Sequence, residues 1–144
     1  MHKPATNSLG NRPILLVDDN PMDIDLTLQA FAENNITNPV QVYRDGEEAL
    51  EYIQHHEMLD TLQVPALVLL DLHLPKVCGF DVLRLARLEP LWTLIPFIIL
   101  TSSRESADIA LAYELGANAY FTKPLDIAEF KNTIRTITPY WMQK

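Results

Sequence analysis

The sequence is poor in cysteine and basic residues, and it has no long hydrophobic run. Its 144 residues contain one cysteine, Cys78, which excludes an internal disulfide and suits a reducing compartment. Eleven basic residues stand against 19 acidic ones, a net charge of −8, which disfavours nucleic acid as a partner. No apolar stretch approaches the roughly 20 residues of a membrane helix, and the polar start lacks the apolar centre of a secretory signal. We therefore expect a cytoplasmic protein that contacts neither membrane nor nucleic acid.

The chain has enough apolar residues for a single core. Hydrophobic residues make up 48% of a length typical of one domain. We expect a flexible N-terminal arm over 1–12, a domain over 13–138 and an aromatic tail over 139–144. The tail, which contains Tyr140 and Trp141, either packs back onto the domain or forms a self-association surface, since exposed aromatic side chains favour interfaces.

Short apolar runs alternate with helical patterns five times along the chain. The predicted strands are 14–18, 40–43, 67–71, 97–101 and 119–122, and the predicted helices are 20–35, 45–56, 79–88, 105–117 and 126–137. Pro21 suits a first helical turn, Asp126 an N-cap and Gly116 a C-cap. Because parallel strands need crossover helices, this order predicts an α/β fold, a single doubly wound (βα)5 domain with a five-stranded parallel sheet.

Polar side chains gather where the predicted strands end. Asp18 and Asp19 end the first strand, Asp71 the third, Thr101 the fourth, and Lys123 follows the fifth. Taken singly, each could be a helix cap, a hydroxyl at the core's edge or a solvated lysine. In open α/β sheets, however, sites form beyond the carboxyl ends of the strands. Three crowded carboxylates raise one another's pKa unless a cation joins them, and an all-oxygen set suits Mg²⁺.

A carboxylate at the edge of a bound Mg²⁺ can attack phosphorus and form an acyl phosphate. The metal and Lys123 would neutralise the phosphoryl oxygens, and the Thr101 hydroxyl would donate to another. These residues therefore predict a phosphoryl-accepting site centred on Asp71.

Four motifs in order resemble the receiver domain of bacterial response regulators. They are "VDDN", "LLDLHLPKVCGFDVL", "ILTSS" and "YFTKP", and the similarity runs from about Ile14 to Ile137. The resemblance implies a flavodoxin-like fold with strand order 2-1-3-4-5. It also implies that Asp71 is the phosphoacceptor, and that Asp18, Asp19 and the backbone carbonyl of His73 complete the Mg²⁺ site.

The same resemblance implies a conformational switch. Thr101 would be drawn towards the phosphoryl group, Tyr120 would follow it inward, and Lys123 would form the salt bridge. It also implies a cis peptide before Pro124, a state that proline makes accessible. Ser102 stands where most receivers have Ala or Gly, so its larger side chain could narrow access to the acceptor.

The stretch "DDNPMDIDLTLQAF", with "DLHLPK", looks most like stand-alone regulators paired with cyanobacterial phytochrome-type histidine kinases. This implies a sensor histidine kinase as phosphodonor, an unknown downstream protein and a homodimer. Signal output would pass through a partner, by onward transfer or phosphorylation-dependent binding. We expect Ile24, Pro124 and Leu125 to dock the kinase, because the hydrophobic residues of the first helix cover more than one stripe.

Two other functions compete with a non-enzymatic receiver. A Mg²⁺-dependent phosphohydrolase with an Asp nucleophile needs a general acid two residues further on, where this chain has His73. A flavodoxin-like cofactor binder needs a Ser/Thr/Gly-rich phosphate loop after the first strand, where "DDNPMD" would repel a phosphate.

Overall fold

The computed structural model describes residues 12–55 and 64–140, which form a five-stranded parallel sheet with helices on both faces. The strands are β1 (Ile14–Val17), β2 (Val40–Tyr43), β3 (Leu67–Leu70), β4 (Phe97–Thr101) and β5 (Ala119–Thr122). The helices are α1 (Pro21–Glu33), α2 (Gly46–Gln54), α3 (Gly79–Ala86), α4 (Ser106–Glu114) and α5 (Ile127–Ile137), with short 3-10 helices η4 (Pro90–Trp92) and η5 (Thr138–Tyr140). The sheet order β2-β1-β3-β4-β5 confirms the predicted flavodoxin-like fold.

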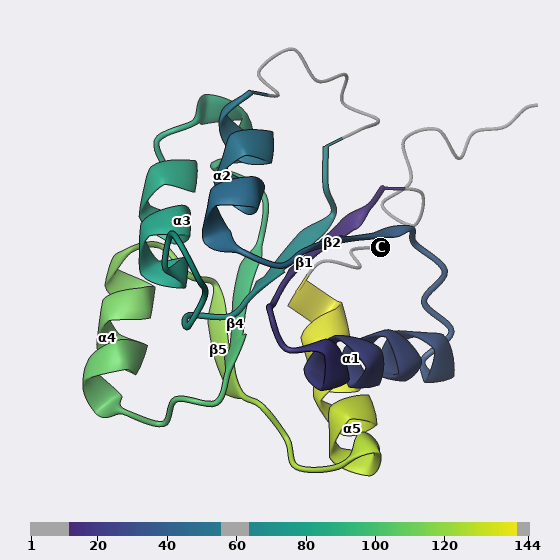
Figure 1. Ribbon diagram of the computed structural model, residues 1–144. Helices are drawn as coiled ribbons and strands as arrows, with labels where there is room; N and C mark the ends of the chain where they lie inside the picture. Colours follow the sequence, from purple (N-terminus) through teal and green to yellow (C-terminus); the bar gives the residue numbers. More distant parts are fainter. Residues whose placement is uncertain (1–11, 56–63, 141–144) are drawn as a thin grey trace, which may run out of the picture.

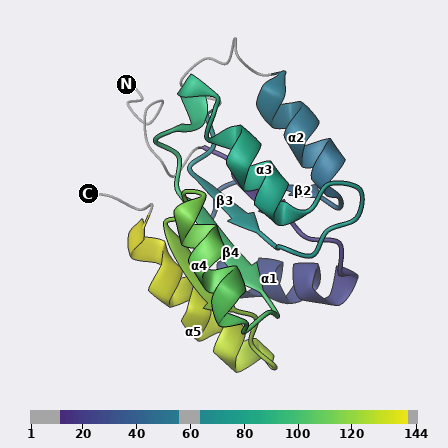
Figure 2. The ribbon, with the colours of Figure 1, turned by 90° about the vertical axis from the view of Figure 1, so that its left-hand side faces the viewer.

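The helices form two layers around the sheet. Helices α1 and α5 cover one face, and α2, α3 and α4 cover the other (Figures 1 and 2). Each layer buries its own hydrophobic cluster. One cluster includes Phe31 and Phe130 beneath α1 and α5, and the other includes Trp92 and Phe97 beneath α2 to α4. Within the described residues no helix is both long and apolar enough to span a bilayer.

The central strands bring the polar strand ends to one edge of the sheet. Strands β1, β3 and β4 are buried along their whole length, as expected for parallel strands covered on both faces. The parallel pairing sets Val17 beside Leu70. The residues that follow these two, Asp18 and Asp71, therefore leave the sheet at the same edge.

The predicted Pro21 and Asp126 lie at the starts of their helices. The Asn20 side chain accepts a hydrogen bond from the Asp23 backbone N–H (3.0 Å), and Pro21 occupies the first turn of α1. Asp126 caps α5 in the same way. The C-cap of α4 is Leu115, and the predicted capping residue Gly116 lies one position further on, at φ +111°, a backbone conformation that L side chains rarely adopt.

Three details differ from the expectations. Helices α1 and α4 are shorter than predicted and end at Glu33 and Glu114, because Asn35 (φ 60°) and Gly116 (φ 111°) have backbone conformations that a right-handed helix does not contain. The sequence patterns did not predict η4 and η5. Every peptide bond among the described residues is trans, including Lys123–Pro124, so the implied cis bond is wrong here; proline lowers the preference for trans without abolishing it.

The predicted arm and most of the predicted tail lie outside the described residues. The structure describes nothing of 1–11 or 141–144. At the start of the tail, the Tyr140 ring lies edge-on to Phe121 of β5, with 6.4 Å between the ring centroids. This part of the tail therefore contacts the domain.

An arginine links the loops at the opposite edge of the sheet. The Arg87 guanidinium donates hydrogen bonds to the carbonyl oxygens of Trp92 (2.8 Å) and Gly116 (2.9 Å) and to the Asn118 side chain (2.8 Å). It also lies over the Phe97 ring, 4.7 Å from the centroid. One side chain thus joins the end of α3, η4 and the loop before β5.

Candidate functional site

Asp71 occupies the carboxyl end of β3 and is 6% exposed. Its Oδ2 lies 2.7 Å from the Lys123 Nζ. Its Oδ1 accepts hydrogen bonds from the Thr101 hydroxyl (2.7 Å) and from the His73 backbone N–H (3.2 Å). Both oxygens of the predicted acceptor are therefore held in place.

Lys123 is the cation at the centre of the site. Its Nζ contacts Asp71 and also lies 3.0 Å from Asp18 Oδ2 and 2.8 Å from Asp23 Oδ2. Its backbone N–H donates to the Thr101 carbonyl (2.7 Å), which fixes the start of the loop. Burial alone would lower the pKa of Lys123, but hydrogen bonds and Coulomb attraction to the carboxylates outweigh it and raise the pKa well above its usual value. The ammonium is charged at neutral pH.

Three carboxylates form an acidic pocket beside this lysine. Asp18, Asp19 and Asp71 each offer an oxygen, and these oxygens lie within 4.8 Å of one another. Asp18 is buried and Asp19 is exposed. Burial raises the pKa of Asp18, against the opposing effects of the Asn20 N–H and of Lys123. An all-oxygen set with one side open to water fits a divalent cation that keeps part of its hydration shell.

The two predicted switch residues lie beside the pocket. Thr101 is fully buried and donates its hydroxyl proton to Asp71. The Tyr120 hydroxyl donates to the Ser103 carbonyl (3.0 Å), and burial raises the pKa of this phenol. Ser102, the residue after Thr101, is exposed. The sequence-predicted Asp18, Asp19, Asp71, Thr101 and Lys123 thus all lie at one edge of the sheet.

A fourth carboxylate, Asp23, was not predicted as part of the site. It lies in the first turn of α1, and its side chain accepts a hydrogen bond from the Lys123 ammonium (2.8 Å). A helix that starts directly after a strand end presents its first turn to that edge. This placement was the available signal.

One expected docking residue is wrong. Ile24 is 3% exposed and belongs to the hydrophobic cluster under α1, because the helix turns Ile24, Thr27 and Phe31 towards the sheet. The exposed apolar side chains near this edge are Met22 (70% exposed) and Leu125 (88% exposed).

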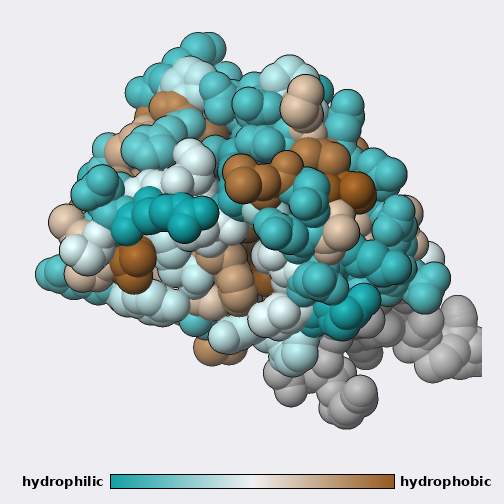
Figure 3. Space-filling view, turned by 90° about the horizontal axis from the view of Figure 1, so that it is seen from below, coloured by the Kyte–Doolittle hydropathy of each residue, from teal (hydrophilic) through white to brown (hydrophobic). Residues whose placement is uncertain are grey.

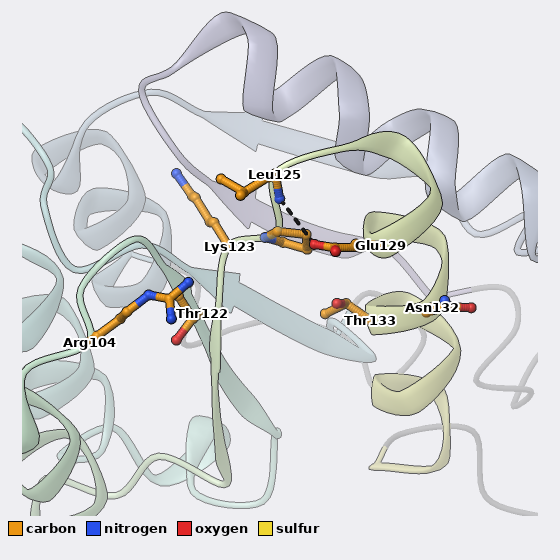
Figure 4. Close-up of a pocket in the computed structure, with 8 residues that line it drawn as sticks. Arg104, Thr122, Lys123, Leu125, Glu129, Asn132 and Thr133 are labelled. Carbon is orange, nitrogen blue, oxygen red and sulfur yellow. Dashed lines mark hydrogen bonds between the residues drawn. The ribbon is translucent and has the colours of Figure 1, made fainter.

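An open pocket of about 440 Å³ lies next to the site. It is lined by Arg104, Thr122, Lys123, Pro124, Leu125, Glu129, Asn132 and Thr133. Arg104 extends from the loop after β4 towards Thr122, while Glu129 accepts a hydrogen bond from the Leu125 N–H (3.4 Å) (Figure 4). Lys123 thus lines this pocket and also contacts Asp18 and Asp71 of the acidic pocket.

Two curated relatives cover most of the chain. It is 38% identical over 129 residues to a probable methanogenesis regulatory protein, FilR2, of Methanothrix harundinacea, covering 90% of this chain and 83% of the relative. It is 32% identical over 130 residues to response regulator Rcp1 of Synechocystis sp., covering 90% of this chain and 88% of Rcp1.

Two solved structures of response regulators are also similar to this chain along most of its length. The phosphorylated cyanobacterial phytochrome response regulator RcpA superposes with a TM-score of 0.81 at 32% identity, covering 92% of this chain and 95% of RcpA. The Mn²⁺-bound form of Rcp1 superposes with a TM-score of 0.78 at 31% identity, with the same coverage.

The family comparison matches nearly the whole described domain. Residues 14–135 match the model of the response regulator receiver domain. This match and the likeness to Rcp1 indicate a signalling domain and decide against the phosphohydrolase alternative. The acidic pocket, the buried lysine and the hydroxyl lie on the strand ends where the receiver motifs predicted them. The chain belongs to the response regulator receiver domain family.

Proposed function

We propose that this chain accepts a phosphoryl group on Asp71 from a histidine kinase and signals through the resulting change in conformation. The observation that carries the proposal is the environment of the Asp71 carboxylate, which contacts a buried ammonium and a buried hydroxyl and borders two further carboxylates. This combination suits a nucleophile that must receive a dianionic group.

The transfer is a displacement at phosphorus. An Asp71 oxygen attacks the phosphorus of a phosphohistidine, the P–N bond breaks, and the histidine nitrogen leaves with the bonding electrons and takes up a proton. A Mg²⁺ ion held by Asp18, Asp19, Asp71 and the His73 backbone carbonyl would supply charge neutralisation for the phosphoryl oxygens. Lys123 stabilises another of these oxygens, and Thr101 can donate to a third.

The switch uses contacts near Asp71. A phosphoryl oxygen offers the Thr101 hydroxyl a more highly charged acceptor than the carboxylate it now binds. Tyr120, bonded to the Ser103 carbonyl, is positioned to follow the loop after β4. The phosphoryl group then favours one arrangement of this loop by its differential contacts, which shifts the population of the domain.

The kinase would be of the phytochrome type and the setting cytoplasmic. Support comes from RcpA, a cyanobacterial phytochrome response regulator with similarity along almost the whole of both chains. The downstream protein would recognise the phosphorylated state or receive the phosphoryl group in turn, and the chain would act as a homodimer.

Docking of the kinase would use the surface around the strand ends. Met22 and Leu125 are exposed there, and Pro124 and Leu125 line the open pocket beside Lys123. Seen from this edge, hydrophobic patches lie among hydrophilic side chains (Figure 3). Covering such exposed apolar groups with a partner lowers the free energy of the complex. We therefore assign Met22, and not the buried Ile24, to the docking surface on α1.

The test is chemical phosphorylation with Mg²⁺ and acetyl phosphate or phosphoramidate. We expect an acid-stable, base-labile adduct on the wild type that Asp71→Asn abolishes. The matched control is Asp81→Asn, an exposed carboxylate on α3 that pairs with Arg84, which should leave the adduct unchanged. A wild type that stays unmodified under these conditions would overturn the proposal.

A further inference from the structure

Asp23 binds the central lysine, yet the phosphoryl transfer described above does not use it. Its Oδ2 lies 2.8 Å from the Lys123 Nζ, nearly as close as Asp71 Oδ2 at 2.7 Å. The Lys123 side chain is 8% exposed and that of Asp23 is 24% exposed. The contact is therefore partly shielded from water, which strengthens it relative to a surface ion pair.

The Lys123 ammonium is fully occupied in this structure. A lysine ammonium has three N–H donors. Three carboxylate oxygens, from Asp18, Asp23 and Asp71, lie within 3.0 Å of the Nζ. A phosphoryl oxygen can gain a hydrogen bond from Lys123 only if one of these carboxylates gives up its contact.

The three carboxylates differ in what happens to them when an acyl phosphate forms. Asp71 loses its carboxylate charge because one oxygen becomes bonded to phosphorus. Asp18 has a backbone donor, the Asn20 N–H (3.0 Å), and faces the acidic pocket. Asp23 is outside the three-carboxylate pocket and keeps its full charge in both states.

The charge balance of the site makes Asp23 unfavourable to the phosphorylated state. With a divalent cation bound in the acidic pocket, the four carboxylates and the ammonium would leave one negative charge in excess. Replacing the Asp71 charge with a phosphoryl dianion adds one more. Without Asp23 the phosphorylated site would carry only one excess charge, and Lys123 would have a free donor.

We propose that Asp23 is a positioning residue that holds Lys123 in the unphosphorylated state and competes with the phosphoryl group for it. This inference rests on the proposed function of Asp71. Its consequence is that Asp23 lowers the equilibrium occupancy of the phosphorylated state and favours return to the resting state.

The experiment measures the binding of beryllofluoride, a phosphoryl analogue that forms an adduct with a carboxylate, by calorimetry of the full chain at saturating Mg²⁺. We expect Asp23→Asn to bind beryllofluoride roughly fivefold more tightly than the wild type, the upper end for a partly exposed ion pair. Asp25→Asn is the matched control, because Asp25 is exposed on the same helix and carries the same charge. It should stay within about twofold of the wild type. Asp23→Glu, which restores the charge, should return the affinity towards the wild-type value.

A second titration, with Mg²⁺ alone, separates competition from structural damage. Asp23→Asn should bind Mg²⁺ roughly two- to fivefold more weakly, because Lys123 then pairs more strongly with Asp18 and Asp71 and a negative charge is lost. Opposite signs in the two titrations support the inference, since a damaged site would lose affinity for both.

The possible failures are distinguishable. If the wild type forms no adduct, or if Asp71→Asn still forms one, the proposed phosphoacceptor is wrong and the role of Asp23 is overturned with it. If the wild type and Asp71→Asn behave as expected but Asp23→Asn binds beryllofluoride no more tightly than Asp25→Asn, only the role of Asp23 is overturned.

Discussion

Replacing Arg87 with methionine should cost the domain about 3 kcal/mol of unfolding free energy. Its guanidinium donates to three partly buried carbonyl oxygens, those of Trp92 (2.8 Å), Ile95 (3.0 Å) and Gly116 (2.9 Å). Charge-assisted hydrogen bonds contribute about 1.5–3 kcal/mol each. Taking the lower value, and subtracting the roughly 2 kcal/mol of side-chain entropy that an ordered arginine gives up, leaves about 2.5 kcal/mol. Loss of the contact with the Phe97 ring adds about 0.5 kcal/mol.

The assay is urea unfolding followed by tryptophan fluorescence, since Trp92 is buried in the same region. Arg84→Met is the matched control: Arg84 lies in α3, which ends just before Arg87. Its ion pair with Asp81 is about half exposed, so its loss should cost less than about 0.5 kcal/mol. Arg87→Lys should recover little, because an ammonium cannot reproduce the planar fork. If the unfolding free energies of Arg87→Met and Arg84→Met differ by less than about 1 kcal/mol, the Arg87 hydrogen bonds do not stabilise the fold as argued.

Two further predictions concern the site, and two concern glycines. Thr101→Val should weaken beryllofluoride binding roughly tenfold in calorimetry, because a hydrogen bond to a charged acceptor is lost; unchanged affinity would refute this. Burial raises the pKa of Asp18, so a proton competes with the metal at higher pH than for an ordinary aspartate, and Mg²⁺ titrations should show affinity falling as the pH is lowered. That pH dependence should diminish in Asp18→Asn. Gly79→Ala should lose about 2–3 kcal/mol in urea unfolding, since a Cβ there would overlap the backbone of Asp71 and Leu72. Gly116→Ala should lose about 1–2 kcal/mol, because φ at Gly116 is +111°, a backbone conformation that L side chains rarely adopt.

The strand ends could be predicted from the sequence for a simple reason. A parallel strand buried on both faces is a continuous apolar run, so the first carboxylate or hydroxyl after it marks the edge of the sheet. Asp18, Asp71 and Thr101 follow or close such runs, and all three lie at the predicted edge. The order of the strands came from the family resemblance, since alternation alone does not distinguish which strands are neighbours.

Contacts between distant segments could not be predicted in this way. Arg87 reaches acceptors that follow it by 5 to 31 residues, and no local pattern indicates that these loops meet. Ile24 was placed on the wrong side of α1 because apolar residues alternate with polar ones from Met22 to Leu28, which leaves the buried stripe ambiguous. The packing of α1 against α5 decides it.

The contacts of Lys123 also join segments of the chain that are synthesised at very different times. Lys123 contacts Asp23, 100 residues earlier in the chain, and Asp71, 52 residues earlier. A chain that emerges from the ribosome presents Asp18, Asp19, Asp23 and Asp71 long before their counter-charge is made. Until β5 joins β4, the sheet edge carries uncompensated like charges, and closing such long loops is slow. The receiver site can therefore close only after Lys123 has been synthesised and β5 has paired with β4.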